Sequence, residues 1–269
     1  MNKIDVIISA YNWPDALQKT LLGFTQQTYP YFRILIADDG SDSDTGEVIK
    51  TFKKKHRIEI IHCWQPDRGF RKARMINKTM KLSKTRQVIF TDQDTIPHPD
   101  FIKEHYKRFV PNGILVGGYL RLSKKYTQNL DFKKIKNMDY LTQVTWKRKK
   151  DLLWKHVKSL FYQLNPLHNH RPSIMGLNFS IDRQAFLKVN GYDMNYEGWG
   201  QEDSDLANRI WKAKFPFKSC WNLCLAFHQW HPENPTKKES RNREYYKRPG
   251  VPIECKNGYL QAGNPTVLS

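Results

Sequence analysis

The stretch Gln87-Val-Ile-Phe-Thr-Asp-Gln-Asp94 decides the fold class, because a short apolar run leads directly into two carboxylates. Residues 88–90 have the length and composition of a buried β-strand. Asp92 and Asp94 follow at the point where that strand ends. In open α/β sheets, ligands bind outside the carboxyl ends of the strands, so acidic residues at a strand end favour this class of fold.

Strand and helix patterns alternate four times in the N-terminal half of the chain. Each predicted strand is short and apolar, and an amphipathic helix follows each one. The alternation predicts a mostly parallel, twisted, Rossmann-like α/β sheet with helices on both faces. The predicted strands cover residues 5–11, 33–39, 58–64 and 87–92, and the predicted helices cover 14–27, 71–82, a segment ending at 53–55 and a segment after Pro99.

Polar residues follow each of these four strands. Because the carboxyl ends of parallel strands meet at one edge of a sheet, we expect the four polar groups to line one crevice. They are Ala10-Tyr11-Asn12, Asp38-Asp39, Gln65-Pro66-Asp67-Arg68 and Asp92-Gln93-Asp94.

A second acidic stretch is Glu197-Gly-Trp-Gly-Gln-Glu-Asp-Ser-Asp-Leu206, in which four carboxylates fall within nine positions. Apolar residues then continue at helical spacing, so the acids lie at a loop-to-helix junction. Such carboxylates repel one another, while a helix N-terminus favours acids in its first turn. Helix capping accounts for one or two of them. The other interpretation is a catalytic base with an orienting partner.

The length of 269 residues suits one large domain, or a domain with a substantial appendage, and in either case a sizeable core. No signal peptide is recognised, and no apolar stretch reaches the roughly 18–20 residues needed to cross a bilayer. We therefore expect a cytoplasmic protein, with a peripheral position on the inner face of the plasma membrane as a further candidate. The four cysteines show no C-x-x-C spacing, which indicates neither a zinc site nor a disulfide framework.

The net charge of +19 implies a polyanionic partner, such as nucleic acid, anionic lipid or a phosphorylated substrate. Between Arg121 and Leu160, twelve Lys and Arg stand against three Asp. A helix predicted at 151–164 in this segment is either docked on the core by its apolar face or lies on an anionic membrane surface. Its apolar face comprises Leu152, Leu153, Val157, Leu160, Phe161 and Leu164.

Two carboxylates separated by one residue at a turn, as in Asp92-Gln93-Asp94, can reach one hard cation and its diphosphate ligand. His228, at the end of another predicted strand, would complete the coordination, and a histidine ligand favours Mn²⁺ over Mg²⁺. His231 is the rival ligand. The alternative for His228 is a histidine packed in an aromatic cluster with Phe227 and Trp230.

Asp38-Asp39-Gly40-Ser41 is either an acidic β-turn or a site where a carboxylate accepts from a nucleotide base. The chain has no G-x-G-x-x-G after its first strand and no G-x-x-x-x-G-K-[ST]. This argues against a dinucleotide-binding oxidoreductase and against a P-loop enzyme. A metal bridging the diphosphate, with Arg68 or Arg71 nearby, would take the place of a glycine-rich loop.

These motifs resemble those of family 2 glycosyltransferases with the GT-A fold. The residues that carry the resemblance are Val6–Asn12, Asp38–Ser41, Arg68–Ala73 and Asp92–Asp94. The stretch from Asn178 to Asp203 is similar to the C-terminal galactosyltransferase-type module of β-1,4-galactosyltransferases and chondroitin-polymerase domains. The resemblance covers residues 1–122 and 174–232, and the basic segment between them is not covered.

The resemblance implies a role for each matched residue. Asp203 would be the general base, with Glu202 holding the acceptor, and Asp39 would recognise uracil. A Met75-Ile76-Asn77 sequence stands where the family often has an Arg-Asn pair, which leaves the role of Asn77 open. The implied metal ligands are Asp94, His228 and Asp92, and the implied nucleotide-sugar-binding residues are Ala10, Tyr11, Asn12, Asp39, Arg68, Arg71, Asp92, Gln93 and Trp199.

The implied reaction is an inverting transfer of a hexose or N-acetylhexosamine, dependent on Mn²⁺ or Mg²⁺. The donor would be a UDP-sugar, and the acceptor a hydroxyl of a glycan or lipid-linked glycan, of the bacterial surface polysaccharide or lipopolysaccharide type. The implied segments are a nucleotide-sugar-binding half (1–122), a basic, partly helical insert (123–173), an acceptor-binding and catalytic half (174–232) and a basic C-terminal tail (233–269).

Two other functions are weighed against this one. The net charge suggests a nucleic-acid-binding α/β protein, but no nucleic-acid motif is present, so nucleic acid is not an expected partner. A sugar nucleotidyltransferase shares α/β topology, but the glycine-rich, basic N-terminal loop expected for it is missing. An anionic membrane surface remains a candidate partner of the basic segment.

Overall fold

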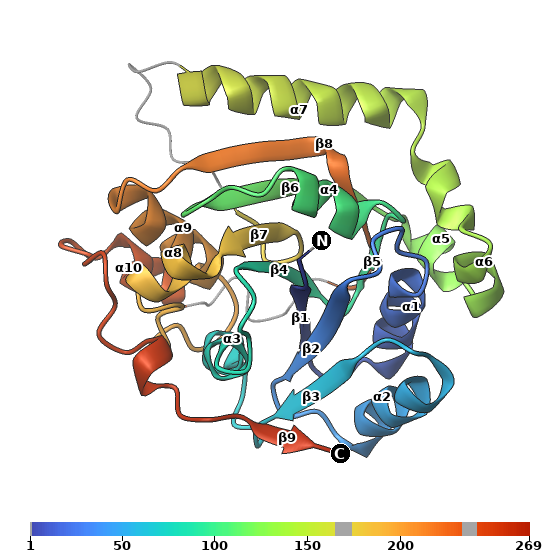
Figure 1. The fold of residues 1–269 in the computed structure, drawn as a ribbon, viewed down its shortest axis with the longest axis horizontal. Helices are drawn as coiled ribbons and strands as arrows, with labels where there is room; N and C mark the ends of the chain where they lie inside the picture. Colours follow the sequence, from blue (N-terminus) through green and yellow to red (C-terminus); the bar gives the residue numbers. More distant parts are fainter. Residues whose placement is uncertain (1, 165–173, 233–240) are drawn as a thin grey trace.

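A computed structural model describes residues 2–164, 174–232 and 241–269. One nine-stranded sheet runs through the described residues in the order β5-β8-β6-β7-β4-β1-β2-β3-β9 (Figure 1). The strands are β1 (Ile4–Ala10), β2 (Phe32–Asp38), β3 (Ile60–Trp64), β4 (Gln87–Asp92), β5 (Thr95–Pro97), β6 (Ile114–Arg121), β7 (Phe179–Asp182), β8 (Phe217–His228) and β9 (Thr266–Leu268).

Helices cover both faces of the sheet, as predicted (Figure 1). The alternation of strand and helix predicted for the N-terminal half is confirmed within a few residues at each boundary. The α-helices are α1 (Pro14–Phe24), α2 (Ser43–Lys55), α3 (Lys72–Met80), α4 (Phe101–Lys107), α5 (Lys124–Gln128), α6 (Phe132–Lys136), α7 (Trp146–Leu164), α8 (Arg183–Lys188), α9 (Glu202–Lys212) and α10 (Asn242–Lys247), and the 3₁₀ helices are η1 (Asp139–Gln143) and η3 (Tyr259–Gln261).

The sheet is mixed, with a parallel block at its centre. β1 pairs in parallel with β2 and β4, β2 pairs in parallel with β3, and β6 pairs in parallel with β8. β7 lies between β4 and β6 and is antiparallel to both. The prediction of a mostly parallel sheet is confirmed: in the described residues β1, β2, β3, β4, β6 and β8 run in one direction, and β5, β7 and β9 run in the opposite direction.

The side chains of β1 are buried on both faces of the sheet, and the sheet accordingly has two cores. Val6 and Ile8 pack with α1 and α2 on one face, whereas Ile7 belongs to the core formed with α3 and α9 on the other. Successive side chains of a strand point to opposite faces, so a strand that is apolar at every position must be covered on both sides. This places β1 in the middle of the fold and its carboxyl end at the centre of one sheet edge.

The long helix α7 (Trp146–Leu164) is confirmed as an element, but the first of its two interpretations, docking on the core by its apolar face, is wrong. Leu152 is buried, yet Leu153, Val157, Leu160 and Phe161 are all exposed. The helix lies along β8 and contacts that strand through a different side (Figure 1). No helix in the described ranges is long and apolar enough to cross a membrane.

The C-terminal segment adds structure that the sequence pattern does not reveal. β9 pairs antiparallel with β3 at the edge of the sheet. Nearby, the side chain of Asn190 donates to the carbonyl oxygen of Cys255 at 2.7 Å and accepts from the backbone N–H of Leu260 at 2.8 Å. Residues 241–269 are therefore part of the domain, and residues 233–240 of the predicted tail lie outside the described residues.

A buried ion pair on α9 holds this helix to the rest of the domain. Asp205 and Arg209 are almost fully buried, and their Oδ2 and Nε atoms are 2.6 Å apart. Tyr196 donates to the other oxygen of Asp205, and Arg209 donates to the carbonyl oxygen of Val189. Asp205 is thus more than the first-turn acid that its position suggests.

We predict that Asp205→Ala lowers the free energy of unfolding by about 3–5 kcal/mol, because it leaves the Arg209 guanidinium buried without its counter-ion. The measurement is urea denaturation followed by circular dichroism. Glu47→Ala is the matched control, because Glu47 forms an i,i+3 ion pair with Lys50 and the two side chains are 69% and 55% exposed. That exposed pair is expected to contribute at most about 1 kcal/mol. Equal losses for the two variants would contradict the role given to burial.

Candidate active site

A cleft with a volume of about 850 Å³ opens at the carboxyl ends of the central strands. Its walls come from residues that are far apart in sequence: the ends of β1, β4 and β8, the segment 174–177, and the loop that leads into α9. Acidic and histidine side chains gather in it, and these are Asp39, Asp92, Asp94, Glu202, Asp203, His228 and His231.

The end of β1 is joined to the turn after β4 by a reciprocal pair of hydrogen bonds. The backbone N–H of Tyr11 donates to Gln93 Oε1 at 3.0 Å, and Gln93 Nε2 donates to the carbonyl oxygen of Tyr11 at 2.7 Å. Ala10, Tyr11 and Gln93 line the cleft. Asn12 holds the neighbouring turn, since its backbone N–H donates to Ser41 Oγ and its Oδ1 accepts from the backbone of Asp42.

The two acids at the end of β2 have different surroundings. Asp38 is buried, with its carboxylate 2.7 Å from His62 Nε2 and bonded to the backbone N–H of Ser41, so it supports the turn. Asp39 lines the cleft and accepts from Gln65 Nε2 and from the backbone N–H of Arg71. Burial raises the pKa of Asp39 to about 6, although both hydrogen bonds oppose that rise.

The two predicted arginines do not contribute to the cleft wall in the described residues, but the next basic residue does. Arg71 Nη2 donates to the carbonyl oxygen of Pro66, and Arg68 is exposed away from the lining. Lys72, which sequence reasoning missed, lines the cleft and donates to Asp92 Oδ1 at 2.7 Å. Its only signal in the sequence is its place in the Gly69-Phe-Arg-Lys72 run.

Lys72 is surrounded by negative charge. Burial disfavours the charged ammonium, but the neighbouring carboxylates outweigh this effect and hold the pKa of Lys72 well above its usual range. Those carboxylates belong to Asp92, Asp203 and Glu202. One fixed cation thus offsets the repulsion among acids that come from β4 and from the start of α9.

Asp94, His228 and His231 form a group that could hold a metal ion. Asp94 Oδ2 is 3.5 Å from Nε2 of His228 and 3.6 Å from Nε2 of His231, and the three potential ligand atoms lie within 4.8 Å of one another. The structure therefore brings both histidines to the same carboxylate, where the sequence offered them as rivals. Asp92, the other predicted ligand, is paired with Lys72 instead.

The carboxylate of Asp203 is held by two fixed donors. The phenol of Tyr192 donates to Oδ1 at 2.8 Å, and the backbone N–H of Gly176 donates to Oδ2 at 2.9 Å. Burial raises the pKa of Asp203, while Lys72 opposes that rise. The carboxylate is thus oriented at the cleft wall.

Asn77, whose role the sequence left open, supports this arrangement from behind. Its side-chain amide donates to the carbonyl oxygen of Tyr192 at 2.7 Å and accepts from the backbone N–H of the same residue at 2.9 Å. The buried amide fixes the backbone of Tyr192 and so places the phenol against Asp203.

Glu202 has a different environment from its neighbour. The side chain lines the cleft and is buried, and its Oε2 has no hydrogen-bond partner among the described residues. Burial raises the pKa of Glu202 to about 7, with the adjacent Asp203 adding to the rise. A buried carboxylate oxygen without a donor is unfavourable, so the site is poised to accept a hydrogen bond from a bound molecule.

Trp199 lies on the loop that leads into α9 and lines the cleft. The loop needs left-handed backbone at Gly198 and Gly200, with φ of +80° and +98°. Asn242 of α10 secures it, because its side-chain amide donates to the carbonyl oxygens of both glycines. The loop conformation that presents the Trp199 ring at the cleft therefore favours glycine on both sides of the tryptophan.

The domain has a Rossmann-like block extended by antiparallel strands, and one cleft holds both the strand-end acids and a potential metal group. This combination is that of a GT-A-type glycosyltransferase domain. The sequence matches the glycosyl transferase family 2 profile over residues 5–188. The chain belongs to this family. A second match, described as the N-terminal domain of galactosyltransferase, covers residues 155–229.

The chain is similar to known transferases along most of its length. It is 23% identical over 245 residues to a validoxylamine A glucosyltransferase of Streptomyces hygroscopicus subsp. jinggangensis, covering 86% of this chain and 57% of that protein. It is 24% identical over 257 residues to a hyaluronan synthase of Pasteurella multocida, covering 90% of this chain and 26% of that protein. The chain thus spans about half of the first relative and a quarter of the second.

A solved structure confirms the fold class. A mannosyltransferase from Pyrobaculum calidifontis, in complex with GDP-Man and Mn²⁺, superposes with a TM-score of 0.61 over 87% of this chain and 58% of that chain. The sequence identity is 16%, so the likeness concerns the fold.

We predict that His228→Ala and His231→Ala each weaken Mn²⁺ binding by more than about tenfold, because each removes one ligand from the same group. The affinity is measured by calorimetric titration of Mn²⁺ into the protein. His56→Ala is the control, because His56 stacks on Phe52 outside the cleft. Unchanged affinity in either cleft variant would remove that histidine from the ligand set.

Proposed function

We propose that this chain is a metal-dependent, inverting glycosyltransferase that moves a hexose or N-acetylhexosamine from a UDP-sugar to a hydroxyl of a glycan acceptor. The observation that carries the proposal is a single cleft holding both the Asp94–His228–His231 group and the oriented Asp203 carboxylate. A donor diphosphate and an acceptor hydroxyl need these two kinds of group close to each other.

The donor side of the proposal rests on the ends of β1 and β2. Tyr11 and Asp39 line the part of the cleft that these strands form, and Gln93 fixes the backbone of Tyr11. Each oxygen of a carboxylate has more than one lone pair, so Asp39 can accept from a uracil N–H while keeping its bonds to the protein. The solved structural neighbour holds GDP-Man, so a comparison of UDP with GDP is the direct test of the donor base.

The donor set fits a divalent transition metal. One carboxylate and two imidazoles suit Mn²⁺ better than Mg²⁺, which prefers oxygen ligands alone. Three protein ligands also leave coordination positions for diphosphate oxygens. When bound, the ion would stabilise negative charge on the departing nucleoside diphosphate.

The acceptor side rests on the start of α9. Asp203 is proposed to take the proton from the acceptor hydroxyl, which then attacks the anomeric carbon from the face opposite the diphosphate. A single displacement inverts the configuration and needs no covalent intermediate. Glu202 is proposed to accept from another hydroxyl of the acceptor through its buried Oε2, which has no partner among the described residues.

The acceptor class is proposed from the relatives and the shape of the site. Trp199 offers an aromatic face at the cleft, a surface that suits the apolar side of a sugar ring. Among the relatives are a hyaluronan synthase and a chondroitin synthase of Escherichia coli, the latter 23% identical over 254 residues. A glycan or lipid-linked glycan, of the kind used to build bacterial surface polysaccharides or lipopolysaccharides, is therefore the proposed acceptor.

We predict that Asp203→Asn reduces transfer from a UDP-sugar by about 10²–10⁴-fold, the contribution expected of a general base. UDP binding is expected to be unchanged. Glu202→Gln is expected to raise the KM for the acceptor more than it lowers kcat, because it weakens a hydrogen bond rather than removing the base.

The measurement is release of UDP coupled to acceptor glycosylation, across a panel of UDP-sugars. Glu197→Gln is the matched control from the same acidic stretch, because Glu197 is exposed and does not line the cleft. The reverse pattern, with kcat lost in Glu202→Gln and kept in Asp203→Asn, would assign the base to Glu202. No transfer from any UDP-sugar by the wild type would refute the donor assignment.

We predict that UDP binds more weakly as the pH falls through about 6, the raised pKa of Asp39. Below that pH Asp39 is protonated and loses the charge that attracts the uracil N–H, so affinity drops by up to roughly tenfold per pH unit. Calorimetric titration with UDP over a pH series measures this. Asp39→Asn is expected to bind UDP weakly without this pH dependence, while Asp42→Asn, at an exposed position, keeps it. Equal affinity for UDP and GDP would contradict base recognition at this site.

A further inference from the structure

We propose that α7 docks this protein on an anionic phospholipid surface through the outer, apolar side of the helix. This goes beyond the proposed reaction, because it concerns a surface that lies outside the cleft and needs no donor or acceptor. It rests on three observations: which side of α7 faces the protein, what covers the other side, and where the charges lie.

The inner side of α7 is mainly polar, and it is the side that contacts the sheet. His156 Nδ1 is 3.2 Å from Ser219 Oγ on β8, and the ammonium of Lys155 lies 4.9 Å from the ring centroid of Trp221. Arg148 donates to the carbonyl oxygens of Gln143 and Arg121. Among the apolar residues of α7 whose burial is described, only Leu152 is buried.

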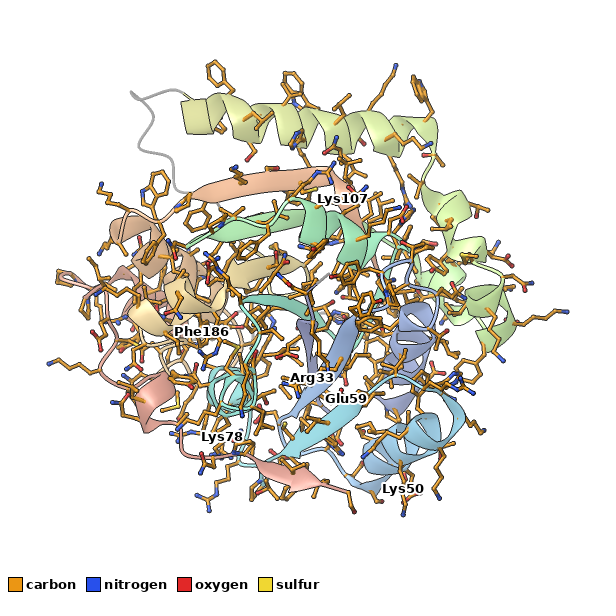
Figure 2. The ribbon with its side chains drawn as sticks, viewed as in Figure 1. Arg33, Lys50, Glu59, Lys78, Lys107 and Phe186 are labelled. Carbon is orange, nitrogen blue, oxygen red and sulfur yellow. The ribbon has the colours of Figure 1, made fainter. Side chains whose placement is uncertain are left out.

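The outer side of α7 is an apolar stripe that faces solvent. Its residues follow one another at spacings of three, four and seven, so they share one helical face. Trp146 is 71% exposed and Trp154 is 68% exposed. Figure 2 shows side chains standing on this side of the helix, away from β8. The apolar stripe consists of Trp146, Leu153, Trp154, Val157, Leu160 and Phe161.

Basic side chains border the stripe. The helix carries six Lys and Arg against one Asp. On a helical wheel, Lys147 and Lys158 fall on one border of the stripe and Lys149 on the other, whereas Lys150 falls within it, above the ring of Trp146. An apolar stripe that contains tryptophan and has a cationic border is the pattern of a helix that lies in a bilayer interface.

The charge selects the partner. A second protein with a complementary apolar groove would cover the stripe, but it would also have to neutralise the lysines that border the stripe. An anionic bilayer does both, because its acyl region takes the apolar side chains while its headgroups attract the lysines. The N-terminal part of α7 also lies near the cleft, since Arg148 is bonded to the backbone of Arg121, a residue that lines the cleft.

The test is flotation of the full chain with vesicles of phosphatidylcholine containing phosphatidylglycerol, compared with pure phosphatidylcholine. We expect binding to the anionic vesicles only, with release at high salt, because screening weakens the attraction of the lysines. Replacing Lys147, Lys149 and Lys150 with Gln is expected to lower the partition coefficient on the order of 100-fold. The paired variant Trp154→Ser with Val157→Ser is expected to lower it by roughly tenfold or more.

Matched controls separate this surface from general effects of charge and exposure. Lys53, Lys54 and Lys55 on α2 are also three exposed lysines, on the opposite side of the molecule where Lys50 is labelled in Figure 2. Replacing them with Gln removes the same charge, and replacing the exposed Leu260 with Ser removes apolar surface elsewhere. Both controls are expected to bind vesicles as the wild type does.

Three outcomes would overturn the proposal. They are equal binding by the α7 variants and the wild type, equal binding to zwitterionic and anionic vesicles, and self-association that the Trp154→Ser and Val157→Ser variant abolishes. The last would show that a second copy of the chain covers the stripe. The flotation assay needs no sugar nucleotide, so a negative result would refute membrane docking without bearing on the proposed reaction. Likewise, a negative result in the transfer assay would not bear on membrane docking.

Discussion

One ammonium group among several carboxylates holds the functional part of this domain together. Lys72 is the first residue of α3 and forms an ion pair with Asp92 at the end of β4. The carboxylates of Glu202 and Asp203 also lie close enough to raise the pKa of Lys72. Without a cation at this point, acids from two parts of the chain would repel one another at the wall of the cleft. The ion pair therefore does two things. It joins a strand-end acid to the start of α9, and the charge of Lys72 opposes the rise in pKa that burial causes at Glu202 and Asp203.

The positions of the strands and the acids at their ends could be predicted because they depend on local pattern. A run such as Ile4–Ala10 must be covered on both faces, and the parallel pairing of neighbouring strands then collects their ends at one edge. The class of the fold, and the gathering of Asp39, Asp92 and Asp94 in one cleft, follow from that rule. The short strands β5 and β9 could not be predicted, because their three residues carry no period of their own.

The parts of the site that the sequence did not reveal depend on long-range contacts. Asp38 and Asp39 are adjacent and chemically identical, and contacts with residues further along the chain separate their tasks: His62 binds Asp38, whereas Gln65 binds Asp39. The link between Asn77 and Tyr192 spans 115 positions. The orientation of α7 stayed open for a related reason: periodicity locates the apolar side of a helix, but it does not say whether the protein covers that side.

The hydrogen bond from Gly176 to Asp203 has a consequence for natural variation in this chain. The φ of Gly176 is not in the left-handed region, so backbone conformation does not require glycine at this position. A Cβ at this position would instead lie 2.7 Å from both Asp203 Oδ2 and Lys72 Nζ. Those atoms are the ends of flexible side chains, so an alanine would be accommodated during folding, at the expense of alignment in the cleft. Substitution at Gly176 would therefore yield a stable protein with a disordered charge network, a lesion that thermal or expression screens overlook.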